Sequence, residues 1–91
     1  MLDSVTIEVE LIGFAAAFLT TIAFIPQVIK VVKTRSVEGL SLTTYLIFIV
    51  GVFLWLIHGI NLGSISMIAG NSITVILALI IIYFMIKSKI S

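Results

Sequence analysis

Two long uncharged stretches dominate the hydrophobic pattern of the chain. Leu11–Ile29 contains no charged side chain and is about as long as the roughly 20 residues that a helix needs to cross a bilayer. Gly39–Ile86 is also uncharged and is long enough for two crossings. Glycines, an asparagine and serines in His58–Ser66 interrupt this second stretch, which is typical of a turn. The pattern therefore predicts three membrane-spanning helices, at 9–32, 42–61 and 66–86.

The composition favours a membrane protein over a soluble domain. The 91 residues are 62% hydrophobic and 10% charged, whereas soluble domains are about 45–50% apolar and about 25% charged. We therefore expect one all-α integral membrane domain over residues 1–91. The N-terminal residues are acidic rather than basic, so we expect the first span to be retained and not cleaved as a signal peptide.

The composition also argues against several classes of function. A net charge of +1 gives no reason to expect nucleic-acid binding. The lack of cysteine removes disulfides and thiolate metal sites, and a single histidine, His58, cannot build a metal site within one chain. We therefore expect no metal, no cofactor and no catalytic residue, and the chain is not predicted to be an enzyme.

The distribution of charge predicts an orientation. The basic residues all lie between the first two spans or after the third, which are places on the same side of the membrane: Lys30, Lys33, Arg35, Lys87 and Lys89. Because cytoplasmic segments collect Lys and Arg, we expect the N-terminus outside and the C-terminus inside. Three of the four acids then lie on the outer side: Asp3, Glu8 and Glu10. In the inner connection, Gly39 is expected to take a positive φ and Ser41 to cap the second helix.

Trp55 and Asn71 are expected to lie at the same depth in the membrane. Trp55 is about six residues from the outer end of its span, and Asn71 is about five residues inside the outer end of its own. At a rise of about 1.5 Å per residue, both are roughly 8–9 Å below the outer boundary. An indole face can pack against the CH face of a sugar ring, and an amide both donates to and accepts from hydroxyl groups. We predict that this pair binds a neutral, hydroxyl-rich solute.

Each of these two residues also has a purely structural interpretation. Tryptophan is common in interfacial belts, and asparagine often joins membrane helices to one another. A membrane subunit that transports nothing is therefore an open alternative. The middle of the spans contains no ionisable side chain of the kind that proton- or ion-driven carriers use. For a carrier, this composition predicts facilitated diffusion along a gradient.

The stretch FIPQVIKVV places Pro26 and Gln27 inside the first span. Proline removes a backbone hydrogen bond and clashes with the preceding turn, and an amide in hydrocarbon needs a partner. Pro26 is about 15 residues into the span and roughly 7 Å from the inner surface. The pair therefore predicts either a static kink or a flexible joint beside the cytoplasmic mouth.

Together, these features resemble a known family. The Pro26-Gln27 pair, the connector TRSVEGLS, the tryptophan of the second span and the asparagine of the third are similar to those of the SemiSWEETs, the bacterial half-size relatives of the SWEET sugar transporters in the PQ-loop superfamily. The likeness covers residues 11–88. It implies a three-helix bundle completed by a parallel homodimer, with the sugar path on the two-fold axis. In the family, the residues that match Trp55 and Asn71 line the sugar site, and the proline that matches Pro26 is a hinge.

One departure from the family pattern concerns the outer gate. Some relatives close the outer side with a tyrosine and an Arg–Asp pair just after the second span. Here His58 is at the tyrosine position and the following NLGSI carries no charge. We therefore expect the outer gate either to close by packing and neutral hydrogen bonds or to be leaky, with His58 as a rim residue rather than a proton relay.

The resemblance implies a sugar uniporter of the bacterial cytoplasmic membrane that works by alternating access. Trp55 and Asn71 would bind the sugar, Pro26 with Gln27 would form the inner hinge, and His58 would belong to the outer gate. One alternative is a PQ-loop carrier of another small polar solute, such as an amino acid. The other is the non-transporting membrane subunit described above.

Overall fold

The computed structural model describes residues 4–90, which form three helices and the two connections between them. The helices are α1 (Ser4–Thr34), α2 (Leu42–Leu62) and α3 (Ile65–Ile90). All three are long and apolar enough to cross a membrane. They cover the three predicted spans, and α1 and α3 extend beyond them at both ends. Asp3, one of the acids expected on the outer side, lies outside the described residues.

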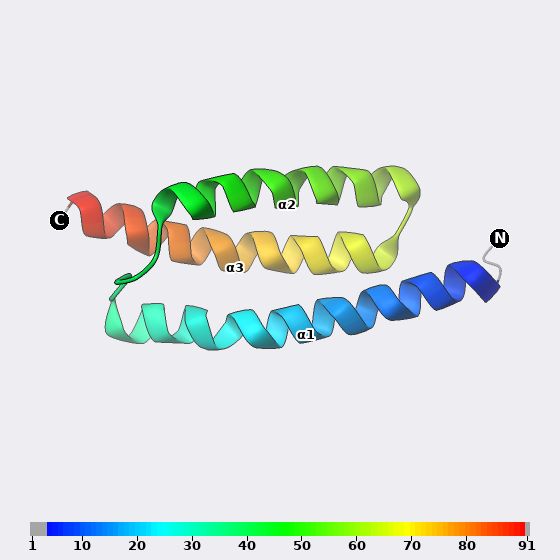
Figure 1. Ribbon diagram of the computed structural model, residues 1–91, viewed down its shortest axis with the longest axis horizontal. Coiled ribbons are helices and arrows are strands. Elements are labelled where there is room, and N and C mark those ends of the chain that lie inside the picture. Colours follow the sequence, from blue (N-terminus) through cyan, green and yellow to red (C-terminus); the bar gives the residue numbers. More distant parts are fainter. Residues whose placement is uncertain (1–3, 91) are drawn as a thin grey trace.

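α3 lies between α1 and α2 and packs against both of them (Figure 1). Its residues Ala78 and Ile81 have no exposed surface. Both neighbouring helices bury valine or isoleucine side chains in the same core: Val28 and Val31 of α1, and Ile49 and Val52 of α2. Most other large apolar side chains remain exposed, as expected for helices surrounded by lipid. α3 is thus the central helix of the bundle.

The two ends of the bundle differ in charge. The start of α1 and the α2–α3 turn lie at one end, while the α1–α2 connection and the C-terminal end of α3 lie at the other (Figure 1). All five basic residues belong to this second end, which is therefore predicted to face the cytoplasm. We call the two ends outer and inner accordingly. At the inner end the guanidinium of Arg35, the first residue after α1, lies 5.1 Å from the ring centroid of Phe84 on α3.

The inner connection between α1 and α2 has the backbone chemistry that its sequence predicts. Gly39 has a φ of 84°, in the left-handed region. The side chain of Ser41 accepts a hydrogen bond of 3.2 Å from the backbone N–H of Thr44 and so caps α2. Both expectations for this connection are confirmed.

The outer turn consists of only Gly63 and Ser64. Gly63 has a φ of 67° and its N–H donates to the carbonyl of Ile60 at 3.1 Å, while Ser64 N–H donates to the carbonyl of Gly59 at 2.9 Å. These bonds close the end of α2. Ser64 Oγ accepts a hydrogen bond of 3.3 Å from Met67 N–H and thereby caps the start of α3. The turn is tight, so the outer ends of α2 and α3 stay close together.

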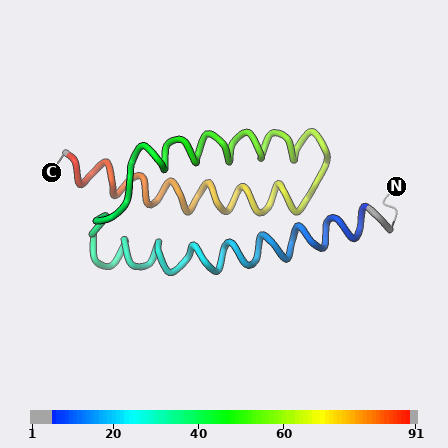
Figure 2. The backbone as a smooth tube through the Cα atoms, in the orientation of Figure 1, coloured from blue at the N-terminus to red at the C-terminus, as the bar shows by residue number. Residues whose placement is uncertain are grey.

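α1 is continuous through Pro26. The helix runs from Ser4 to Thr34 without interruption, and Figure 2 shows this segment as one unbroken helical coil. Because proline has no N–H, the carbonyl of Ile22 cannot receive the usual helical hydrogen bond from position 26. The side chain of Pro26 is exposed. The inner third of α1 therefore contains a locally weaker point within an unbroken helix.

Candidate functional site

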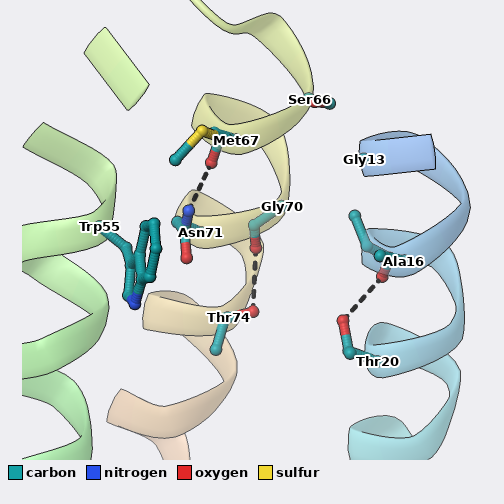
Figure 3. A pocket seen from close by; sticks show the side chains of 10 residues that line it. Gly13, Ala16, Thr20, Trp55, Ser66, Met67, Gly70, Asn71 and Thr74 are labelled. Carbon is teal, nitrogen blue, oxygen red and sulfur yellow. Dashed lines mark hydrogen bonds between the residues drawn. The ribbon is translucent and has the colours of Figure 1, made fainter. Parts of the chain in front are cut away.

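A pocket of about 350 Å³ lies between the outer halves of α1 and α3, with Trp55 of α2 at its side (Figure 3). Small-molecule sites have volumes of about 300–1,000 Å³, so the pocket is large enough for a small solute. All three helices contribute to its lining: Gly13, Ala16, Ala17 and Thr20 from α1, Trp55 from α2, and Ser66, Met67, Gly70, Asn71 and Thr74 from α3.

Trp55 and Asn71 lie next to each other at this pocket (Figure 3). The side-chain N–H of Asn71 donates a hydrogen bond of 2.8 Å to the carbonyl of Met67. This bond fixes the plane of the amide, and Figure 3 shows its oxygen turned away from Met67. Trp55 is 58% exposed, so only part of the indole is covered by its own chain. The structure thus brings the two residues to one place, whereas their role in substrate binding stays a prediction.

Neutral hydroxyl groups complete the polar part of the pocket. Thr20 Oγ1 donates to the carbonyl of Ala17 at 3.1 Å, and Thr74 Oγ1 donates to the carbonyl of Gly70 at 2.9 Å. Each threonine uses its proton within its own helix and keeps its oxygen as an acceptor. None of the lining residues, all within the described part of the chain, is charged. The pocket therefore offers an aromatic face and neutral hydrogen-bonding groups, which suit an uncharged polar solute.

His58 lies one helical turn beyond Trp55 on α2, toward the outer end. Its ring is 5.7 Å from the indole ring, centroid to centroid, with the planes at 69°. His58 is exposed and does not line the pocket. The structure places His58 beside Trp55, whereas its place at the rim of an outer gate stays a prediction.

Pro26 and Gln27 lie apart from the pocket, in the inner half of α1. Gln27 Oε1 accepts a hydrogen bond of 3.4 Å from the hydroxyl of Tyr45 on α2. Around this bond, the rings of Phe24, Tyr45 and Phe48 lie with centroids 6.2–6.4 Å apart. These side chains connect α1 to α2 directly. Pro26 thus directly precedes a residue of the contact between α1 and α2, and its function as a hinge stays a prediction.

The sequence did not predict the contact between the outer half of α1 and the start of α3. It places Glu10 only among the outer acids, whereas the structure shows its carboxylate hydrogen-bonded to Ser64 and Ser66. The uncharged segment NLGSI gave no indication of a charged partner. Two small-residue pairs one turn apart, Gly13 with Ala17 and Ser66 with Gly70, are the signal that could have predicted close approach of α1 and α3.

Comparisons with known proteins identify relatives of this chain by sequence and by structure. The sequence model of the PQ loop repeat family matches residues 9–88. The sugar transporter SemiSWEET of Bradyrhizobium diazoefficiens is 50% identical over 70 residues, which are 77% of this chain and 81% of that protein. The sugar transporter SemiSWEET of Leptospira biflexa is 41% identical over 75 residues, 82% of this chain and 88% of that protein.

Solved structures show the same fold. A crystal structure of a SemiSWEET in the inward-open conformation superimposes with a TM-score of 0.83 at 35% identity, covering 90% of this chain and 88% of that one. A bacterial homologue of SWEET transporters gives a TM-score of 0.79 at 37% identity, covering 86% of this chain and 94% of that one. The predicted all-α fold of three long apolar helices is confirmed.

Proposed function

We propose that this chain, which belongs to the SemiSWEET family of PQ-loop proteins, carries a sugar across a membrane by facilitated diffusion. It is a multi-pass membrane protein, and its family consists of transporters rather than enzymes. Its relatives from Bradyrhizobium and Leptospira are sugar transporters by name. The proposal extends that substrate class to this chain.

The observation that carries the proposal is the uncharged pocket shared by Trp55 and Asn71. The indole face can cover the CH face of a sugar ring, and the Asn71 amide oxygen can accept from a sugar hydroxyl. The hydroxyl oxygens of Thr20 and Thr74 add two further acceptors. A charged solute would lose its hydration without gaining an ionic partner here, which favours a neutral one.

The proposed transporter is a parallel homodimer. Trp55 is 58% exposed in a single chain, so one protomer covers only one side of a bound solute. A second copy, related by a two-fold axis along the membrane normal, would supply another Trp55 and Asn71 and enclose the path. The dimer is parallel because the basic inner ends of both copies belong on the cytoplasmic side.

In the proposed alternating-access cycle, the inner ends of α1 and α2 form one gate and their outer ends form the other. At the inner end, bending at Pro26 would separate Gln27 from Tyr45 and open the path to the cytoplasm. At the outer end, His58 would form part of the rim above Trp55. Two such states must differ by only a few kcal/mol for both to be visited. The bacterial origin of the SemiSWEET relatives favours the bacterial cytoplasmic membrane as the location.

Uptake into proteoliposomes tests the proposed function. The probes are radiolabelled glucose, sucrose and a neutral amino acid, each offered as a gradient to vesicles with and without the protein. We expect saturable uptake of at least one sugar, inhibited by the same sugar without label, and no uptake of the amino acid. Uptake of the amino acid alone would assign another polar solute. Uptake of none of the three would support the non-transporting membrane subunit.

A further inference from the structure

The carboxylate of Glu10 connects α1 to the turn between α2 and α3. Ser64 Oγ donates to Glu10 Oε2 at 2.6 Å, and Ser66 Oγ donates to the same oxygen at 2.9 Å. The backbone N–H of Ser66 donates to Glu10 Oε1 at 3.0 Å. The two serines follow Glu10 by 54 and 56 residues in the sequence. Hydrogen bonds to an ionised group are about twice as strong as neutral ones, so this is a substantial tertiary contact.

The contact lies at the N-terminal end of α3. Ser66 is in the first turn of this helix, where backbone N–H groups have no helical partner. The carboxylate of Glu10 satisfies one of these donors and places a negative charge at the positive end of the helix dipole. Ser64 donates its proton to Glu10 and accepts a bond from Met67 N–H with the same oxygen. Glu10 and Ser64 together fix how α3 begins.

Next to this contact, toward the inner end of the bundle, α1 and α3 approach each other closely. A Cβ atom added at Gly13 would lie 2.9 Å from the Cβ of Ser66. One turn further in, a Cβ added at Gly70 would lie 2.9 Å from the Cβ of Ala17. Both distances are too short for ordinary side chains, so the absence of a side chain at the two glycines permits the approach. Glu10 holds together the outer end of this close helix pair.

The close helix pair is also a wall of the candidate sugar pocket. Gly13, Ser66 and Gly70 all line the pocket beside Trp55 and Asn71 (Figure 3). Ser66 is 3% exposed, and it contacts Glu10 through both its hydroxyl and its N–H. A separation of α1 from α3 at Glu10 would therefore change the shape of the pocket next to Ser66.

We propose that Glu10 is a positioning residue for transport, which acts through Ser64 and Ser66 to hold the outer half of α1 on α3 and thereby shapes the outer side of the pocket. This inference deepens the proposed function and rests on it. The outer half of α1 and the start of α3 then move as one unit. Bending of α1 is confined to the inner side, where Pro26 interrupts the helical hydrogen bonds.

The first experiment compares Glu10→Gln with the control Glu8→Gln in proteoliposome uptake. Both variants remove one negative charge near the start of α1, but the side chain of Glu8 is exposed and does not line the pocket. We expect Glu10→Gln to raise the KM for sugar about tenfold, because hydrogen bonds to a charged group are replaced by weaker ones. Glu8→Gln should leave the KM unchanged. A purely structural role would lower the maximal rate through loss of folded protein and leave the KM as in the parent.

A double-mutant cycle shows whether Glu10 acts through the serines. Ser64→Ala and Ser66→Ala should each raise the KM for sugar, as Glu10→Gln does. These two variants test the proposal even if Glu10→Gln does not fold. In the Ser64→Ala/Ser66→Ala background, Glu10→Gln should have much less effect than in the parent. An unchanged KM in Glu10→Gln, or effects that simply add, would overturn the proposal.

A second readout does not depend on sugar. The chain has no cysteine, so Ala16→Cys places a single thiol in the pocket wall on α1. We expect Glu10→Gln, and not Glu8→Gln, to change the rate at which a membrane-impermeant maleimide labels this thiol by about tenfold. Equal rates in all three proteins would overturn the positioning role. If the parent transports no sugar but the rates differ as expected, the proposed function fails and the positioning of the pocket by Glu10 stands.

Discussion

The imidazole of His58 meets the indole of Trp55 edge to face, with ring centroids 5.7 Å apart and planes at 69°. This arrangement is favourable for aromatic pairs. It places His58 beside the indole, one helical turn nearer to the outer end. We expect that His58 keeps the indole, which we propose to face the sugar, in place by packing.

Substitution of His58 tests this packing role. His58→Phe retains an aromatic edge against Trp55 and should keep the KM for sugar within about twofold of the parent value. His58→Ala removes the contact, which contributes about 0.5–1.5 kcal/mol, and should raise the KM about two- to tenfold. Proteoliposome uptake measures both variants. A parental KM in His58→Ala would mean that the ring does not hold Trp55.

Pro26→Ala tests the hinge. The substitution restores a backbone donor inside α1, and alanine is favoured over proline in a helix interior by about 3 kcal/mol. Thermal unfolding in detergent should therefore show a variant at least as stable as the parent. Uptake should fall while equilibrium sugar binding is retained, because a stiffer α1 disfavours the bent state. Ile29→Ala, at an exposed position one turn further along α1, is the control. Uptake of Pro26→Ala at the parental rate would make the proline a passive kink.

The sequence predicts the helices well and their mutual arrangement poorly. The uncharged stretches mark three spans because hydrocarbon excludes charge along the whole length of a crossing. Trp55 and Asn71 could be matched because depth in the membrane follows directly from position along a span. Apart from the small-residue pairs of α1 and α3, spans that are apolar on all sides do not reveal which face packs on another helix. The central position of α3 and the contact of Glu10 with Ser64 and Ser66 depend on that packing, so they required the structure.

In a parallel homodimer, the C-terminal ends of both copies lie on the same side of the membrane, which we expect to be the cytoplasmic side. Lys89→Cys introduces a single thiol near the C-terminal end of α3, in a chain that has no other cysteine. An impermeant maleimide should label this thiol in inside-out membrane vesicles and not in right-side-out ones. A bismaleimide with a long flexible linker should join two copies. Labelling from both sides, or a protein that stays monomeric, would contradict the parallel dimer.

Transport should not be coupled to protons. The pocket contains no charged side chain within the described part of the chain, and Glu10 belongs to the hydrogen-bonded contact at the outer end. No series of ionisable groups along the described residues connects the two ends of the bundle through the pocket. With a pH difference imposed across proteoliposomes, the internal sugar concentration should therefore rise no higher than the external concentration. Accumulation of sugar above the external concentration would show coupling.

The most direct test of the proposed site is equilibrium sugar binding to Trp55→Ala and Asn71→Ala, measured beside uptake on the same preparations. Phe53→Ala removes an exposed aromatic ring from α2 that does not line the pocket, and serves as the matched control. Each site variant loses about 1–3 kcal/mol of interaction with the sugar, so affinity should fall about 5- to 150-fold and uptake should be abolished. Phe53→Ala should bind and transport like the parent. If Trp55→Ala and Asn71→Ala assemble normally and still bind and carry sugar with parental affinity and rate, the pocket between α1 and α3 is not the sugar site.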